Sequence, residues 1–154
     1  GRAVDFDGGL GYLEKDSGRS FPKSYLWLQC SDFSQPCSIF LSLARIPFCG
    51  LVFPGCICAV HFGGREYRFA TYEGVKLLET GPGRIVLGQG TRLLEIFLLR
   101  REQGHALKSP AKGLMTGMIR ECNRAKVRFR FLEGSRLLFD LTSENASLEA
   151  VPSL

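Results

Sequence analysis

The chain has 154 residues, of which 45% are hydrophobic and 12 are phenylalanine, so it can bury the core of one ordinary domain. No apolar run reaches the roughly 18 residues that a membrane-spanning helix needs. The longest apolar run, from Ile46 to Phe62, is interrupted by two prolines and two glycines. The composition therefore argues against an integral helical membrane protein and favours one globular domain over residues 1–154.

The formal net charge of +5 is unevenly distributed along the chain. Residues 84–136 hold 12 of the 20 basic residues and 4 of the 15 acidic ones, whereas residues 1–83 contain eight of each. A basic excess could meet nucleic acid, anionic lipid or an acidic substrate, although a charge of this size usually belongs to a solvated face. We expect no nucleic-acid partner, because the basic residues of 126–130 are not interleaved with exposed aromatic residues.

Short segments rich in Val, Ile, Leu, Phe and Tyr recur along the whole chain and are separated by Gly, Pro, Asn or Asp. This pattern is typical of an all-β protein. In chain order it predicts strands at Tyr25–Ser31, Ser38–Ile46, Gly55–Phe62, Arg65–Ala70, Val75–Glu79, Arg84–Leu87, Leu93–Arg100, Lys126–Leu132, Arg136–Thr142 and Leu148–Val151.

Turn residues connect these predicted strands. Gly63 and Gly64 can supply the positive φ angles of a tight two-residue turn, so a hairpin is expected there. The segment from Gly104 to Gly113 contains Pro110 and is predicted to be a longer loop. Leu114–Arg124 is the one segment that could form a short helix. The chain is thus predicted to be an antiparallel barrel or sandwich of about nine or ten strands, with at most one short helix.

Lys126 to Phe131 alternates basic and apolar residues without interruption. In a strand this places Lys126, Arg128 and Arg130 on one face, and Val127, Phe129 and Phe131 on the other. We expect the apolar face to be core and the basic face to be wet.

Six cysteines lie mostly inside apolar runs, such as Cys56-Ile57-Cys58, where a thiol acts as a small core residue. Reduced thiols in a cytoplasmic protein are therefore expected rather than a disulfide framework. No metal site is expected, because Cys-x-Cys is not the usual zinc spacing and the chain has only two histidines.

The segment Glu14-Lys15-Asp16-Ser17-Gly18-Arg19-Ser20-Phe21-Pro22-Lys23-Ser24-Tyr25-Leu26-Trp27-Leu28-Gln29 resembles the tocopherol cyclase pattern E-K-x-W-G-x-x-F-P-x-x-[WY]-x-W-x-Q. Further similar segments follow at residues 67–74, 94–96, 107–110 and 145–149, so the resemblance covers nearly the whole chain. It implies a lipocalin-like β domain. Because the family's proteins are longer, it also implies that this chain is the C-terminal half, with a related lipocalin-like half upstream as its partner.

The resemblance further implies an activity that closes a chromanol ring without a cofactor. The double bond of a prenyl tail is protonated, and a phenolic oxygen of the quinol traps the carbocation. Such chemistry needs an acid whose pKa is raised by apolar surroundings, and an apolar cavity that excludes water from the prenylated quinol. Because such a ligand is apolar, the resemblance also implies a possible peripheral contact of the protein with a membrane.

Glu14 and Asp16 are the predicted catalytic acids, because they flank Lys15 in the segment from Glu14 to Gln29, which we call the diagnostic segment. The alternative is that either carboxylate forms a structural ion pair with Lys15 or Arg19. The remaining predicted substrate-binding residues are mostly aromatic: Lys15, Phe21, Tyr25, Trp27, Gln29, Tyr67, Phe69 and Tyr72.

Tyr25, Trp27 and Gln29 share one face of a strand at two-residue spacing, which could line a ligand pocket or could equally be plain core. Tyr67 and Phe69 could also belong to either environment. Two hypotheses therefore stand. One is a cyclase acting on a prenylated quinol, and the other, favoured by Ser17 and Ser31 in place of the family's usual Trp and Asn, is a non-catalytic lipid-binding or structural domain.

Overall fold

The computed structural model describes residues 1–15 and 17–151. Within them, ten antiparallel strands form one sheet in the order β4-β3-β2-β1-β10-β9-β7-β6-β5, with β8 paired to β9 outside this path. The strands are β1 (Tyr25–Cys30), β2 (Cys37–Phe48), β3 (Leu51–Phe62), β4 (Arg65–Ala70), β5 (Lys76–Thr80), β6 (Arg84–Gln89), β7 (Arg92–Arg100), β8 (His105–Ala111), β9 (Leu114–Glu133) and β10 (Arg136–Ala150). The all-β prediction is confirmed, and the sheet is not closed into a barrel.

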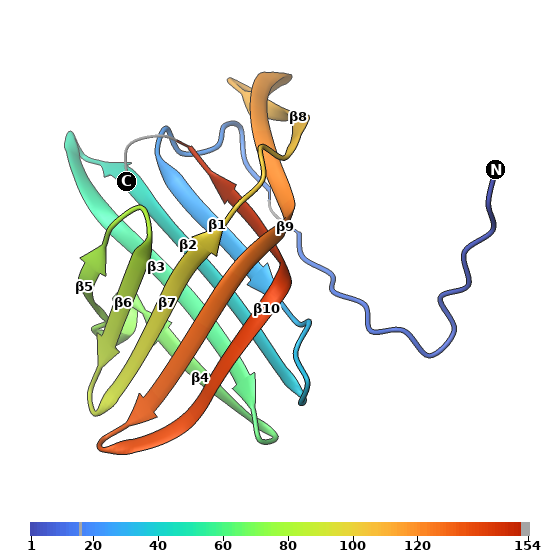
Figure 1. The fold of residues 1–154 in the computed structure, drawn as a ribbon. Helices are drawn as coiled ribbons and strands as arrows, with labels where there is room; N and C mark the ends of the chain where they lie inside the picture. The colour runs from blue at the N-terminus through green and yellow to red at the C-terminus, as the bar shows by residue number, and fades with distance from the viewer. Residues whose placement is uncertain (16, 152–154) are drawn as a thin grey trace.

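The sheet folds over on itself to form two layers. In Figure 1, β1–β4 lie behind β5, β6 and β7, and the strands of the two layers run in crossing directions. Strand β10 belongs to both layers because it pairs with β9 along most of its length and with β1 through residues 147–150. Its pairing with β9 shifts register on both sides of Ala146, and such bulges let a strand bend from one layer to the next.

The core lies between the two layers. Alternate residues of most strands point inward, as Leu26, Leu28 and Cys30 do on β1. Phe129 and Phe131 of β9 are fully buried, as the alternation of cation and apolar residue predicts, while Arg128 on the opposite face is exposed. The predicted hairpin at Gly63 and Gly64 is confirmed, since both glycines have positive φ angles of 59° and 72°.

One aromatic cluster joins strands that are distant in the sheet order. The ring of Phe131 on β9 lies 5.0 Å from that of Tyr67 and 5.8 Å from that of Phe69, both on β4. Phe139 of β10 completes the cluster at 5.5 Å from Phe131. These contacts bring the two layers together, and they place Tyr67 and Phe69 in the core.

A side chain bridges the gap between edge strand β4 and strand β6. Gln89 Oε1 accepts a hydrogen bond of 3.0 Å from the backbone N–H of Ala70, and Gln89 Nε2 donates one of 3.0 Å to the carbonyl of Arg68. Gln89 Nε2 also lies 3.1 Å from Glu73 Oε2, in the 3-10 helix η1 (Thr71–Glu73). The amide thus satisfies one donor and one acceptor of β4, as a neighbouring strand would.

Two predictions in the middle of the chain are wrong. Leu114–Arg124 is the first part of β9 rather than a helix, and most of the predicted loop from Gly104 to Gly113 is β8. The two strands form a hairpin in which Lys112 and Gly113 adopt positive φ angles of 53° and 86°. Pro110 is tolerated because β8 is an edge strand and has no ladder partner on its other side.

No helix among the described residues has the length and apolar composition needed to cross a membrane. The segment before β1 leads away from the sheet in an extended path (Figure 1). The large apolar side chains of residues 1–13 are exposed, including Phe6 and Leu13 at 82% and 95%.

Candidate functional site

The residues of the diagnostic segment meet on the outer face of β1. Both Glu14 carboxylate oxygens accept from the indole Nε1 of Trp27, at 3.1 and 3.0 Å, and Glu14 Oε2 accepts from the Tyr12 hydroxyl at 2.6 Å. Glu14 and Lys15 are exposed, and Asp16 lies outside the described residues. Glu14 is therefore an acceptor for both an indole and a phenol donor.

Tyr25 connects the start of β1 to the end of β10. Its hydroxyl donates to Glu149 Oε2 at 3.0 Å, and its ring packs edge-on against Phe21 at 5.8 Å. Burial, together with the nearby Glu149 carboxylate, raises the pKa of Tyr25, so the hydroxyl keeps its proton. The contacts fix how the diagnostic segment enters the sheet.

The stripe of Tyr25, Trp27 and Gln29 shares one face of β1, as the two-residue spacing indicates. It is the face opposite to Leu26, Leu28 and Cys30, which belong to the core. Gln29 Nε2 donates to Ser31 Oγ at 2.6 Å, and Ser31 Oγ is 3.1 Å from Ser38 Oγ. The stripe is therefore a partly covered outer surface.

The structure does not bring the other predicted residues to this cluster. Tyr67 and Phe69 are core residues on β4. Tyr72 lies in η1 with 67% of its surface exposed, and its hydroxyl accepts from Arg68 Nη1 at 3.3 Å. The predicted set thus divides among an outer cluster, the core and an exposed turn.

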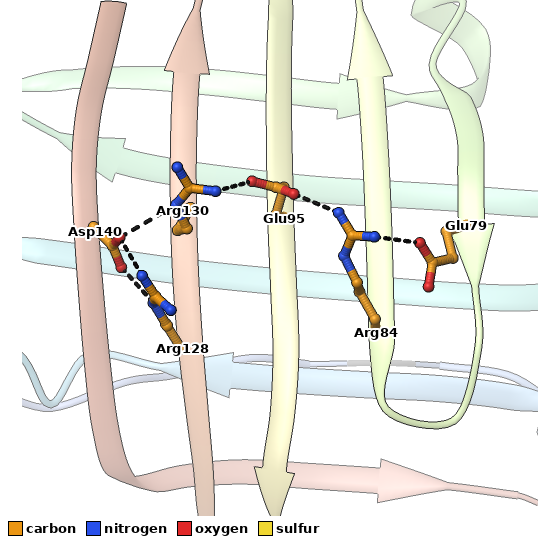
Figure 2. A network of polar contacts seen from close by, with 6 residues as sticks. All are labelled: Glu79, Arg84, Glu95, Arg128, Arg130 and Asp140. Carbon is orange, nitrogen blue, oxygen red and sulfur yellow. Dashed lines mark hydrogen bonds and ion pairs between the residues drawn. The ribbon is translucent and has the colours of Figure 1, made fainter.

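A polar network crosses the outer face of strands β5, β6, β7, β9 and β10. Glu95, which is only 7% exposed, accepts from Arg84 at 2.5 Å and from Arg130 at 2.7 Å. Arg130 also lies 3.2 Å from Asp140, which Arg128 contacts through two hydrogen bonds of 2.7 Å. Figure 2 shows these residues in one row, ending at Glu79 beside Arg84.

Three arginines and three carboxylates make this network electrically balanced. Lys126 is likewise paired, at 2.6 Å from Glu144. The basic face of β9 that the sequence singles out is therefore neutralised by acids of neighbouring strands. The basic residues of 84–136 that form no ion pair with a described residue lie elsewhere, at Arg101, Lys108, Lys112, Arg120, Arg124 and Arg136.

A groove of about 560 Å³ opens between the β8–β9 hairpin and the end of β10. Its apolar wall comes from Ala106, Met118, Ile119, Cys122, Leu148, Ala150 and Val151, and its polar wall from Arg101, Glu102, Gln103 and Arg120. The volume falls in the range of small-molecule sites, and a mostly apolar wall with few polar groups is typical of them. Glu102 is the one carboxyl group among these lining residues.

The sequence prediction missed this groove because it assigned 104–113 to a loop and 114–124 to a helix. The signal was present in the sequence. Met118, Arg120 and Cys122 recur at every second position, as on one face of a strand, and Lys112-Gly113 could form a tight turn. Tyr12 and Glu149, the partners of Glu14 and Tyr25, could not be found because the pairings depend on the fold.

Among the described residues, no group of three or more His, Cys, Asp or Glu side chains could hold a metal ion. The six cysteines are free, and all except Cys49 are buried. Burial raises the pKa of Cys37 and Cys56 to about 12, which keeps them as thiols.

Comparisons with known proteins agree with the resemblance seen in the sequence. A family model described as tocopherol cyclase-like matches residues 1–151. The chain is 25% identical to the chloroplastic tocopherol cyclase of Zea mays and to the probable chloroplastic tocopherol cyclase of Oryza sativa subsp. japonica. Each match covers 97% of this chain and 35% of the relative, so the chain spans about a third of their length. No solved structure matches the chain significantly.

Proposed function

The chain belongs to the tocopherol cyclase-like family, and on that basis we propose that it binds a prenylated quinol or a related isoprenoid in the groove between β8, β9 and β10. The observation that carries this proposal is the composition of the groove. Its apolar lining includes Leu148 and Ala150, which suit a hydrocarbon tail, while Arg101 and Arg120 in its polar lining can donate hydrogen bonds to quinol oxygens.

The second part of the proposal is that the chain assists closure of a chromanol ring. A proton adds to the tail double bond, the phenolic oxygen bonds to the resulting carbocation, and the phenolic proton returns to the conjugate base. The reaction is thus an isomerisation that needs no cofactor, and an enclosed site would protect the carbocation from water. A second lipocalin-like half, the proposed partner, would supply such an enclosure, and the exposed apolar side chains of residues 1–13 support it.

Three carboxyl groups are candidates for the acid. Glu14 and Asp16 belong to the diagnostic segment, whereas Glu102 is the carboxyl group in the groove wall. We therefore propose to compare Glu14→Gln, Asp16→Asn and Glu102→Gln for chromanol formation from a prenylated hydroquinone. Loss of the acid should slow the reaction at least about tenfold, since such groups contribute a hundredfold or more.

Binding is tested separately from catalysis. The groove-filling variant Ala106→Trp should weaken binding of a prenylated hydroquinone at least about tenfold by calorimetry, because the indole would occupy space that the tail needs. Thr116→Trp adds the same side chain to an exposed position of β9 that does not line the groove, and should leave binding unchanged. Equal affinity of the two variants would contradict the groove as the site.

The alternative function is a non-catalytic lipid-binding or structural partner domain. The exposure of Glu14, and its use as an acceptor by Trp27, favour this alternative. Tight binding without any chromanol product, in the wild-type chain and in all three amide variants, would support it against the cyclase. The proposed cytoplasmic location rests on the free cysteines, which suit a reducing compartment.

A further inference from the structure

The β2–β3 turn and the β8–β9 turn lie at the same end of the fold, which we call the hairpin end (Figure 1). The chain from residue 19 to residue 24 connects the β8–β9 turn to Arg45 of β2, near the β2–β3 turn. Gly113 N–H donates to the carbonyl of Arg19 at 2.6 Å, and Arg45 N–H donates to that of Ser24 at 3.0 Å. Five residue steps span at most about 18 Å, so this segment and its two hydrogen bonds limit how far the β8–β9 turn can lie from Arg45.

The hairpin end exposes apolar side chains that contribute nothing to the core. Leu51 at 74%, Leu114 at 66% and Met118 at 64% are the most exposed of them. Eight large hydrophobic side chains are exposed near the two turns, within residues 46–53 and 107–118: Ile46, Leu51, Val52, Phe53, Leu107, Leu114, Met115 and Met118. Apolar side chains are thus exposed around both turns at one end of the fold, and exposed apolar patches mark interaction sites more often than scattered single residues do.

The same end carries many of the basic residues that form no ion pair with a described residue. The segments 19–24, 45–53 and 101–124 contain eight basic residues and two acidic ones. All eight basic residues are exposed, and none of them forms an ion pair with a described residue. They are Arg19, Lys23, Arg45, Arg101, Lys108, Lys112, Arg120 and Arg124.

We propose that the hairpin end docks on an anionic lipid bilayer, with the two turns inserted among the headgroups and the surrounding cations placed over lipid phosphates. Exposed apolar side chains favour the acyl boundary, and nearby Lys and Arg are attracted to the negative surface potential. A protein partner that covered the same end would need both an apolar surface and a strong negative charge. A bilayer with anionic lipids offers both chemistries at once.

Docking in this orientation would also place the groove near the membrane surface. Met118 and Arg120 belong to the hairpin end and also line the groove. Docking at this end would bring the groove close to the lipid phase, where molecules with long hydrocarbon tails are concentrated. The docking proposal itself does not depend on which ligand the groove binds, so the groove-filling variants test a separate point.

Co-sedimentation of the full chain with vesicles tests the proposal. Binding to vesicles of phosphatidylcholine mixed with phosphatidylglycerol should exceed binding to phosphatidylcholine alone at least about tenfold, and should fall as salt is raised. The double variant Lys108→Glu/Lys112→Glu should remove most of this preference. The double variant Leu114→Ser/Met115→Ser should weaken binding about tenfold while the remaining binding stays dependent on salt.

The matched control changes one basic and one apolar residue at the opposite end of the fold. Arg136→Glu/Leu137→Ser lies at the β9–β10 turn, where Leu137 is 47% exposed, and should bind vesicles like the wild type. All these positions are on the surface, so the variants should keep the wild-type melting temperature and circular dichroism spectrum. Binding that is absent for the wild type, or unchanged in both hairpin-end variants, overturns the proposal.

Cys49 at the β2–β3 turn offers an independent measurement, because it is the one exposed thiol among the described cysteines. An environment-sensitive fluorophore attached to Cys49 should shift its emission to shorter wavelength when anionic vesicles are added. The same fluorophore on Ser135→Cys, in a Cys49→Ser background, should not respond. Equal responses at the two ends would also overturn the proposal.

Discussion

Replacement of Phe131 by alanine tests whether the sheet folds back on itself as described. Phe131 is fully buried and contacts the rings of Tyr67, Phe69 and Phe139. Truncation of a buried phenylalanine costs about 3–5 kcal/mol, because apolar contacts are lost and a cavity remains. With a typical total stability of about 5–15 kcal/mol, this variant should unfold at a much lower urea concentration.

A double-mutant cycle isolates the contact between the layers. Phe69→Leu, Phe131→Leu and the double variant should give an interaction free energy of about 1 kcal/mol, the typical size for an aromatic pair. Strands β4 and β9 are separated by β3, β2, β1 and β10 in the sheet, so the two rings can touch only if the layers pack together.

Urea unfolding followed by circular dichroism provides the free energies for this cycle. Phe6→Ala serves as a control, because this side chain is 82% exposed and should change stability by less than about 0.5 kcal/mol. Strictly additive effects of the two leucine substitutions, or a cost below about 1 kcal/mol for Phe131→Ala, would refute the described packing of the layers.

Three further predictions concern thiols, acid stability and the bridge between β4 and β6. A maleimide should label Cys49 rapidly and the five buried cysteines only after unfolding, and intact-mass spectra with several early adducts would contradict this. The hydrogen bonds from Arg128 hold the pKa of Asp140 below its ordinary 3.8, so its stabilising effect is present above that pH and is lost as the pH falls through the folded-state pKa. The urea midpoint should therefore drop below about pH 4, and Asp140→Asn should lower the midpoint at pH 7 and reduce that drop, whereas an identical pH profile would exclude this role. Gln89→Ala should destabilise the fold by about 1–3 kcal/mol and accelerate hydrogen exchange at the Ala70 amide, and unchanged exchange there would show that the bridge is unimportant.

Most strands were predictable because one face of each is buried and the other is exposed to solvent, so apolar and polar residues alternate in the sequence. Arg65–Ala70 was predicted with the bounds of β4, since the glycine turn fixes its start. The hairpin of β8 and β9 was not predicted, because Gly104, Pro110 and Gly113 together resemble a loop. Its strands are largely exposed, so the alternation of buried and exposed residues that marks the other strands is weak there.

Which side chains share one face of a strand was easier to predict than whether that face is buried. The two-residue spacing correctly places Tyr25, Trp27 and Gln29 together, but spacing alone does not decide which face of a sheet becomes the core. The neighbouring strands decide this, because Leu26 and Leu28 pack against residues far away in the sequence. For the same reason, the hydrogen bond from Trp27 to Glu14 could not be predicted from the sequence.

The Gln89 bridge also affects how the protein avoids association with itself. Strand β4 is an edge of the sheet, and an uncovered edge is a template on which another chain can add a strand. Gln89 occupies the Arg68 carbonyl and the Ala70 amide of that edge, so an incoming strand would have to displace it. This one amide side chain thus protects the solubility of the protein as well as its stability, and an unprotected β4 would favour dimers or fibres through strand addition.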